Sequence, residues 1–285
     1  ATITGHNGDI SGELVIPETI DGYPVTRIRY EAFKDCHDLK SVKIADGITY
    51  IGSDAFGGCT SLTSIIIPNS VTSIGKQAFI NCTGLTKINW NAENISGFSR
   101  NNCIFSNAGI SGQGIDVIFG DSVESIPART FFAYEGYQPN IKSVTFGNSI
   151  ISIGSWAFGY CTGLTSITIP DSVIYIEDFA FYCCNKLTSV KFGKNIECIG
   201  DCAFDSCSSL TSITIPEGVK TIGDGSFAGC TNLLNIAIPN TVSYIGSNAF
   251  WSTPWYFLQP DGDIYIGVVG PVRTGKSTFI KKFMD

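Results

Sequence analysis

The hydrophobic and polar positions of this chain repeat with a constant period over most of its length. The stretch "IGSDAFGGCTSLTSIIIPNSVTS", Ile51 to Ser73, is followed at once by "IGKQAFINCTGLTKINW", and three close copies come later. A fixed period of roughly 20 to 50 residues is typical of repeat proteins, whose units stack to bury a shared core. The pattern therefore predicts a solenoid in which each repeat forms one coil.

A phenylalanine marks the same place in every repeat. These anchors form two evenly spaced series: Phe33, Phe56 and Phe79, then Phe158, Phe181, Phe204, Phe227 and Phe250. The longer gap between Phe79 and Phe158 fits three looser copies, anchored near Phe105 and Phe131. We therefore expect about ten coils of 23–27 residues between Arg27 and Ser252.

Within a repeat, the pattern Leu-x-x-Ile-x-Ile predicts a short strand with its apolar side chains inward, as for Leu164, Ile167 and Ile169. The proline that follows, such as Pro170, ends the strand because it has no N–H to donate. The expected fold class is a mainly β repeat protein with parallel strands joined by short turns or 3-10 segments. The only place where a longer helix is expected is the C-terminus, in "STFIKKFMD".

Composition narrows the classes of partner. Of 285 residues, 44% are hydrophobic and 15% are charged, which argues against disorder. A net charge of −7 gives no support for nucleic-acid binding, since such proteins usually present a basic face. No run of apolar residues is long enough for a spanning helix, so no membrane insertion is expected. We expect a monomer.

Eleven cysteines raise the question of disulfides. Seven of them share one repeat position: Cys36, Cys59, Cys82, Cys161, Cys184, Cys207 and Cys230. In a solenoid such residues form a column with side chains pointing the same way, which favours packed thiols over bridges or a metal array. Cys103, Cys183, Cys198 and Cys202 lie outside this register, and a bridge among them stays open.

The sequence offers little for catalysis. Its two histidines, His6 and His37, lie in the first coils, and the preferred interpretation is that they are solvated loop residues. A Cys36–His37 pair is the alternative, because a nucleophile needs a base beside it. No Cys-x-x-Cys or His-x-x-x-His pair occurs, and the acidic residues are scattered over turns. We predict no catalytic residue and no metal site.

The repeat pattern I-G-x-x-A-F-x-x-C-x-x-L-T-S-I-x-I-P resembles that of BspA-like leucine-rich-repeat proteins, and the resemblance covers residues 1 to about 267. It implies a bacterial surface or secreted protein that takes part in adhesion or interaction without catalysis. No leader peptide is seen among these residues. The expected organisation is a capping coil at 1–26, a solenoid at 27–261 with irregular repeats at 91–140, and a C-terminal segment at 262–285.

A solenoid presents an extended surface to a protein or glycan partner. The outward strand positions carry mainly Thr, Ser and Lys, which are equally typical of a plain solvated face. Aromatic residues outside the core pattern are better candidates, because such side chains often anchor an interface. The predicted partner-binding residues are Trp90, Tyr134, Tyr137, Trp156 and Tyr160, with Tyr175 and Tyr182 as further candidates.

One motif does not belong to the repeat. "GPVRTGKS", Gly270 to Ser277, fits the phosphate-binding pattern G-x-x-x-x-G-K-[ST]. In such a loop Gly270 and Gly275 let the backbone wrap phosphates, Lys276 reaches them and Ser277 holds Mg²⁺. These four residues are the candidate nucleotide contacts, but no further sheet follows to hold the loop rigid, and no cofactor is expected.

The surrounding string, Gly262 to Asp285, resembles the phosphate-loop region of stage IV sporulation protein A, a family of spore-coat ATPases. Three origins stay open: an engineered fusion, a natural fusion or truncation, or coincidence. In a structural role, Ile264, Ile266 and Val268 would add a strand, and the apolar residues Phe279, Ile280, Phe283 and Met284 would form a helical cap. The preferred function is a non-enzymatic binding module. The alternatives are nucleotide binding and a purely structural fusion.

Overall fold

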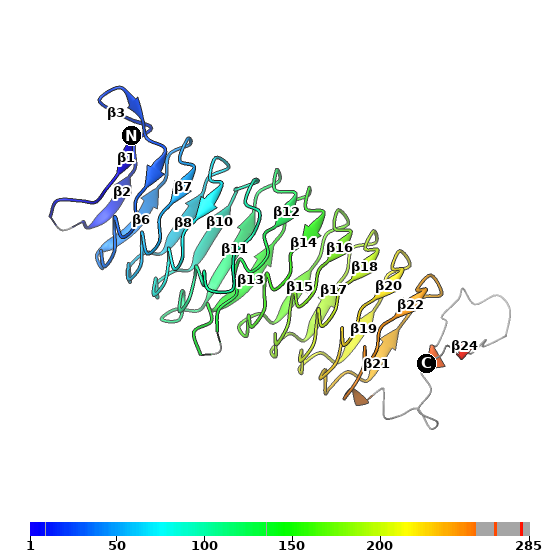
Figure 1. Ribbon diagram of the computed structural model, residues 1–285. Coiled ribbons are helices and arrows are strands. Elements are labelled where there is room, and N and C mark those ends of the chain that lie inside the picture. The colour runs from blue at the N-terminus through cyan, green and yellow to red at the C-terminus, as the bar shows by residue number, and fades with distance from the viewer. Residues whose placement is uncertain (9, 135, 255–264, 267–279, 282–285) are drawn as a thin grey trace. The chain divides into compact units, whose positions relative to one another are not determined.

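The computed structural model describes residues 1–8, 10–134, 136–254, 265–266 and 280–281. Every element it defines there is a β-strand, and the chain is an all-β parallel solenoid of about 11 turns (Figure 1). This confirms the predicted fold class. The chain divides into two compact units, unit 1 (Ala1–Ile150) and unit 2 (Ile151–Asp285). The predicted boundaries at residues 26 and 261 stay predictions.

Unit 1 contains two parallel sheets, in which each strand pairs with its equivalent in the next turn. The longer strands lie side by side in the order β2 (Gly12–Val15), β6 (Leu39–Lys43), β8 (Ser64–Ile67), β10 (Lys87–Trp90), β11 (Ile115–Phe119) and β13 (Ile141–Thr145). The short strands of the second sheet lie in the order β1 (Thr2–Ile3), β5 (Arg27–Ile28), β7 (Tyr50–Ile51) and β9 (Ser73–Ile74), and β12 (Ser125–Ile126) is a further short strand outside that sheet. Neighbouring turns are thus joined by backbone hydrogen bonds on two sides.

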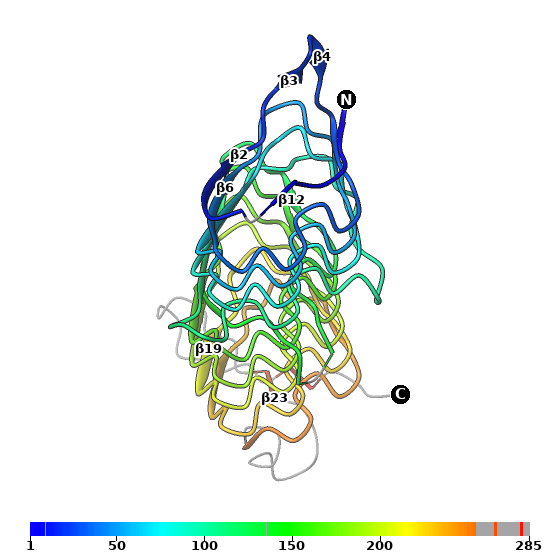
Figure 2. The ribbon, with the colours of Figure 1, turned by 90° about the vertical axis from the view of Figure 1, so that its left-hand side faces the viewer.

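A hairpin interrupts the first turn of unit 1. Strands β3 (Thr19–Ile20) and β4 (Tyr23–Pro24) are antiparallel and are joined by Asp21 and Gly22. Both joining residues have positive φ, 53° and 79°, as a two-residue Asp-Gly hairpin turn requires. In Figure 2 the hairpin projects beyond the first turn, while β2 and β6 lie together on one side of the unit.

Unit 2 repeats the same arrangement with shorter strands. The strands on one side are β14 (Ser152–Ile153), β16 (Tyr175–Ile176), β18 (Cys198–Ile199), β20 (Thr221–Ile222) and β22 (Tyr244–Ile245). On the other side lie two parallel pairs, β15 (Ser166–Thr168) with β17 (Ser189–Lys191) and β19 (Ser212–Thr214) with β21 (Asn235–Ala237). The predicted inward residues Leu164, Ile167 and Ile169 are all buried.

The anchor phenylalanines form the centre of each unit. In unit 1, Phe33, Phe56, Phe79, Phe105 and Phe131 stack with ring centroids 5.2–5.4 Å apart. In unit 2, Phe158, Phe181, Phe204, Phe227 and Phe250 stack at 5.1–5.6 Å. Phe105 and Phe131 therefore continue the column through the looser repeats, as predicted. The distance between successive ring centroids is slightly larger than the distance of about 4.8 Å between paired strands, because each ring follows its own turn.

The Ile-Gly step of the repeat has a steric cause. At Gly75 a side-chain carbon would lie 2.3 Å from the backbone nitrogen of Ser53 in the preceding turn. The Gly75 N–H also donates to the Ile51 carbonyl at 2.7 Å. Only glycine allows two turns to approach this closely at that point.

At the C-terminus, β23 (Tyr265–Ile266) pairs antiparallel with β24 (Ile280–Lys281). The predicted helix is therefore wrong at Ile280, because its backbone belongs to a strand ladder. Ile266 does lie in a strand, as expected. The other residues of the predicted cap lie outside the described residues. Among the described residues, no helix has the length and hydrophobicity needed to cross a bilayer.

Candidate partner-binding site

Each turn presents one edge formed by the seven residues that run from four before the anchor phenylalanine to two after it. We call this surface the turn edge. In unit 2 it comprises segments 154–160, 177–183, 200–206, 223–229 and 246–252. Its backbone is held by hydrogen bonds between turns, such as the Phe181 N–H to the Ala203 carbonyl at 2.8 Å. The scaffold leaves the side chains between the buried positions directed outward.

Four aromatic side chains gather on the turn edge of unit 2. Trp156 stacks on Phe179 with ring centroids 4.4 Å apart and planes 10° apart. Tyr182 lies 5.1 Å from Trp156 and 5.7 Å from Phe179, and it meets Tyr160 edge-on at 5.3 Å. All four are only half-buried. We call these four residues the aromatic cluster; it brings together Trp156 and Tyr160, two of the predicted partner-binding residues.

The backbone of the aromatic cluster is unusual for its residue types. Trp156, Tyr160 and Phe179 have φ values of 61°, 64° and 58°. The same left-handed backbone recurs at the equivalent positions of other turns. Positions equivalent to Trp156 and Phe179 hold Glu31, Asp54, Gln77, Cys103, Arg129, Cys202, Gly225 and Asn248, and those equivalent to Tyr160 hold Asp35, Gly58, Asn81, Asn107, Cys183, Ser206, Gly229 and Ser252. Bulky aromatic residues are disfavoured there, so these three positions carry strain in return for placing large rings at the surface.

Carboxylates share the turn edge of unit 2 with the aromatic cluster. The turn edge of unit 2 holds Glu177, Asp178, Asp201, Asp205 and Asp224, and it holds no Lys, Arg or His. Three of them form a ladder: Asp178 Oδ1 accepts the Asp201 N–H at 2.9 Å, Asp201 Oδ1 the Asp224 N–H at 2.8 Å, and Asp224 Oδ1 the Ser247 N–H at 2.8 Å. The ion pairs found among the described residues of unit 2 are Lys194–Asp171 and Lys220–Glu197, and neither lies on the edge.

The carboxylates of the turn edge act on the thiol of Cys202, together with its burial. Desolvation, followed by Asp205, Asp201, Asp178 and Asp224, raises its pKa to about 11. Four carboxylates from three successive turns therefore act on one half-buried position. Desolvation likewise raises the pKa of the Asp205 carboxyl.

Tyr134 and Tyr137, from the irregular middle of the chain, belong to unit 1. Their side chains are 42% and 59% exposed and line a hollow of about 340 Å³. The Tyr134 hydroxyl donates to Asn101 at 2.7 Å, and the Arg100 guanidinium lies 5.8 Å from its ring. The other lining residues are Lys76, Gln77, Ile80, Asn81, Asn101, Cys103, Ser106 and Asn107. The predicted aromatic residues therefore do not form one site: Trp156 and Tyr160 lie in the aromatic cluster of unit 2, whereas Tyr134 and Tyr137 line this hollow in unit 1.

The prediction for Trp90 is wrong. Its side chain is fully buried, and its indole N–H donates to the Ala92 carbonyl at 3.0 Å. The physical reason is register: Trp90 pairs with Ile67, the second inward isoleucine of the preceding turn. A buried ring cannot contact a partner. Of the two further candidates, Tyr175 is 47% exposed on β16, and Tyr182 joins the aromatic cluster.

Phe179 was missed by the sequence analysis, although it has the closest stacking contact of the aromatic cluster. The repeat places it directly before the buried Ala180-Phe181 pair, in a position held by polar residues or glycine in most other turns. An aromatic residue at a position that is usually polar or glycine would have indicated Phe179 from the sequence.

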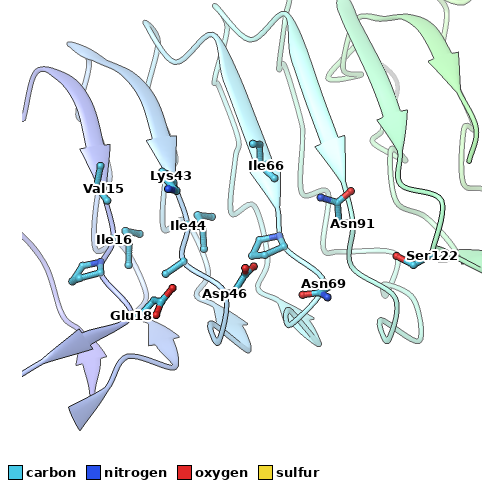
Figure 3. Close-up of a pocket in the computed structure, with 13 residues that line it drawn as sticks. Val15, Ile16, Glu18, Lys43, Ile44, Asp46, Ile66, Asn69, Asn91 and Ser122 are labelled. Atoms are coloured by element: carbon cyan, nitrogen blue, oxygen red, sulfur yellow. The ribbon is translucent and has the colours of Figure 1, made fainter. Parts of the chain in front are cut away.

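A second surface of unit 1 is a groove of about 570 Å³ at the ends of its longer strands. Figure 3 shows Val15, Lys43, Ile66 and Asn91 at the ends of β2, β6, β8 and β10. Glu18 and Asp46 add carboxylates to the lining of the groove. The residues that line this groove include no aromatic side chain, so it lacks the anchors that usually dominate interface energies.

The cysteines form the predicted column. No disulfide links any of the eleven in the part of the chain that the structure describes, and those at the repeat position are buried. The Cys59 thiol donates to the Phe33 carbonyl at 3.2 Å, and the same bond recurs from Cys82, Cys184, Cys207 and Cys230. Desolvation raises the pKa of Cys59 and of Cys230 to about 12. These thiols are packing groups and are poor nucleophiles at neutral pH.

The two histidines have structural partners. His6 stacks on Phe33 with centroids 6.2 Å apart, so its ring continues the phenylalanine column into the first turn. Its Nδ1 donates to the Gly8 carbonyl at 2.7 Å, and its Nε2 lies 3.2 Å from Cys36 Sγ. The imagined Cys36–His37 pair is replaced by Cys36–His6, since His37 donates to the Gly58 carbonyl at 2.8 Å. Within the described part of the chain, no three His, Cys, Asp or Glu residues form a group that fits a metal ion.

The candidate nucleotide contacts Gly270, Gly275, Lys276 and Ser277 lie outside the described residues. They stay a prediction from the sequence.

Comparison with known proteins extends these observations. Residues 13–136 and 126–254 match the model of the BspA type leucine-rich-repeat region, in six copies. Residues 258–285 match the model of the stage IV sporulation protein A ATPase domain.

Among solved structures, the chain is similar to a leucine-rich cell surface protein from Faecalibacterium prausnitzii. The identity is 27%, the match covers 88% of this chain and 87% of that one, and the TM-score is 0.40. A leucine-rich-repeat protein from Bacteroides ovatus is 25% identical over 86% of this chain and 87% of that one, with a TM-score of 0.34.

The C-terminal residues have curated relatives. A 27-residue segment is 92% identical to stage IV sporulation protein A of Clostridioides difficile, and covers 10% of this chain and 6% of that protein. The Bacillus subtilis protein is 88% identical over 24 residues, which is 8% of this chain and 5% of that protein. The chain therefore spans only a small fraction of the length of these relatives.

Proposed function

From the premise that this chain belongs to the BspA-type leucine-rich-repeat family, we propose that it is a non-enzymatic binding module for a protein or glycan ligand. Repeat solenoids generally use their extended surfaces in this way. We further propose that it works as a secreted or surface-attached adhesion protein of a bacterium, as the family resemblance implies.

The observation that carries the proposal is the aromatic cluster. Trp156, Tyr160, Phe179 and Tyr182 are half-buried and stack against one another at the surface instead of in the core. Large aromatic side chains that are partly exposed lose little conformational entropy when a ligand covers them.

The chemistry of the remaining residues supports binding over catalysis. Five thiols of the column donate to backbone carbonyls, and both imidazoles are held by backbone carbonyls. The Cys36 thiol lies 3.2 Å from His6 Nε2, but it is buried in the column, and the His6 ring is stacked on Phe33. Nucleophilic catalysis needs an activated thiol or hydroxyl beside a free base. The solenoid is a fold typical of binding proteins, and its reactive groups are occupied in structural contacts.

The test is a binding screen of the whole chain against purified extracellular proteins and polysaccharides. The first variant carries Trp156→Asn and Tyr160→Ser, which install the residues found at Asn248 and Ser206 in equivalent turns. The second carries Tyr134→Ala and Tyr137→Ala. A ligand that binds the wild-type chain and loses about tenfold or more in affinity with the first variant supports the proposal.

Circular dichroism and melting temperature control for folding in both variants. If only the second variant loses the ligand, the site lies in unit 1 and its hollow of about 340 Å³ replaces the aromatic cluster. A screen in which no ligand binds, or in which neither variant matters, overturns the assignment.

Nucleotide binding through Lys276 and Ser277 is the second candidate, favoured by the match of residues 258–285 to the ATPase domain. Titration with a labelled ATP and Mg²⁺ tests it. Micromolar affinity that Lys276→Ala abolishes would establish a nucleotide site, with Lys281→Ala as a control that removes the same charge. Equal affinity of both variants, or no binding, would dismiss it.

A further inference from the structure

The aromatic cluster does not stand alone on the turn edge of unit 2. The same edge carries five carboxylates and no cationic side chain. The rings supply electron-rich faces, and the carboxylates supply net negative charge. Together they form a surface with a definite electrostatic preference.

The carboxylates are arranged as a column. Asp178, Asp201 and Asp224 occupy the same place in successive turns, each with one oxygen bound to the backbone of the next turn. Like charges stacked at the spacing of paired strands repel one another. In unit 2, Lys194 pairs with Asp171 and Lys220 pairs with Glu197, both away from the edge. None of the ion pairs among the described residues of this unit therefore offsets the repulsion within the aspartate column.

The same carboxylates also act on a neighbouring thiol. Asp178, Asp201, Asp205 and Asp224 all raise the pKa of Cys202, after desolvation. The carboxylates of several turns therefore act on the same region of the edge. A cation brought to this region would gain from all of them at once.

We infer that the turn edge of unit 2 binds a protein segment rich in arginine and lysine, whose cations lie against the Trp156, Tyr160, Phe179 and Tyr182 rings and along the aspartate column. This deepens the proposed function by naming the partner's chemistry at the same site. Guanidinium and ammonium groups are attracted to aromatic faces. The same groups pair with carboxylates, and charge complementarity of this kind speeds encounter and selects against acidic partners.

A neutral glycan fits this surface less well. A sugar would stack on the rings, but it would leave the negative column without compensation. An acidic glycan or acidic peptide would add to the repulsion. The observations therefore favour a basic protein segment over both.

The test measures affinity of the whole chain for labelled peptides by fluorescence anisotropy. One peptide alternates arginine with serine, a second has glutamate in place of each arginine, and a neutral oligosaccharide serves as the third probe. We expect the arginine peptide alone to bind, with at least about tenfold weaker affinity when salt is raised from about 0.05 M to about 0.5 M.

Two variants locate the site. Trp156→Asn should weaken the arginine peptide by about 5-fold to 30-fold, because a cation–π contact is lost, while Trp156→Phe should retain most of the affinity. Asp201→Asn with Asp224→Asn should weaken it by about 2-fold to 10-fold, since the amide keeps the bonded oxygen and removes only the charge. Glu217→Gln, an exposed residue of unit 2 outside the turn edge, is the matched control and should change nothing.

Several results overturn the inference. If the oligosaccharide or the acidic peptide binds in a Trp156-dependent way and the arginine peptide does not, the proposed function stands and the partner's chemistry is wrong. Binding that needs Ca²⁺, or that reflects self-association of the chain through this edge, would also overturn it. Absence of any Trp156-dependent ligand, in this assay and in the broader screen, would remove both proposals.

Discussion

The turn edges of the two units share one backbone pattern and differ in their chemistry. By the same seven-residue definition, the edge of unit 1 comprises segments 29–35, 52–58, 75–81, 101–107 and 127–133. It holds four cations, Arg29, Lys34, Lys76 and Arg129, and three carboxylates, Glu31, Asp35 and Asp54. The edge of unit 2 holds five carboxylates and no cation.

The aromatic residues differ in the same direction. Outside the anchors, the edge of unit 1 has Tyr30 and the buried Phe132, whereas that of unit 2 has the aromatic cluster and Trp251, which is 56% exposed. Lys34 pairs with Glu31 in unit 1, so part of its charge is compensated locally. A solenoid can therefore keep its interior constant while the chemistry of its surface changes from one region to the next.

If the difference is confined to the surface, the interiors should respond alike. Phe79→Ala and Phe204→Ala each remove a fully buried anchor that stacks on two neighbours. We expect each to lower the free energy of unfolding by about 3–5 kcal/mol, because a large cavity is left in the column. Urea denaturation followed by circular dichroism measures both. A difference of more than about 2 kcal/mol between them would mean that the two interiors also differ.

Thiol accessibility should separate the units more finely. The cysteines of unit 1 are all buried, whereas Cys183, Cys198 and Cys202 of unit 2 are half-buried. We expect iodoacetamide to label only these three in the native chain, as read by mass spectrometry of peptides, and all eleven after denaturation. Labelling of Cys59 at the rate of Cys202 would contradict the packed column.

The pH dependence of this labelling tests the carboxylate field. The pKa of Cys202 is raised to about 11, so its reactive thiolate is scarce below that pH and grows about tenfold per pH unit up to it. Asp201→Asn and Asp224→Asn should lower this pKa and speed labelling at pH 8. An unchanged rate would show that Asp201 and Asp224 do not contribute to the pKa of Cys202, which would leave desolvation, Asp205 and Asp178 as its causes.

The smallest expected effect concerns a single ring. Phe179→Asn removes the stack on Trp156, worth about 0.5–1.5 kcal/mol, but places a residue tolerant of left-handed backbone at φ 58°. We expect the two effects to offset, with a change in unfolding free energy within about 1 kcal/mol. Calorimetric melting measures it, with Gln77→Asn in unit 1 as the control. A loss as large as that of Phe204→Ala would mean that Phe179 belongs to the core.

Much of the fold could be predicted because its determinants recur. Ten phenylalanines at nearly constant spacing identify the turns, and the cysteine that follows seven of the eight regular anchors identifies the thiol column; Thr253 takes its place after Phe250. Even the looser anchors Phe105 and Phe131 were placed correctly, since their rings must continue one stack. His6 was not recognised as the first member of that stack, because its turn lacks the regular motif.

The candidate site could be predicted only in part. Exposed aromatic residues were sought one by one, which found Trp156 and Tyr160 and also the buried Trp90. Aligning Trp90 with Ile67 would have shown that it points inward. The contacts of Phe179 and of the aspartate column are made with residues that lie one full repeat away in the sequence, so a search residue by residue does not find them.

The sequence alone determined that the chain coils, how long each coil is and which of its repeated Leu, Ile, Phe and Cys positions face the core, because these follow from a periodic apolar pattern. The tertiary structure decided which outward residues meet. Stacking brings each residue beside its equivalent in the next repeat, so Trp156 meets Phe179, and Asp178, Asp201 and Asp224 form one column. A surface of this kind exists only after the turns are in register, since contact between side chains depends on distance in space.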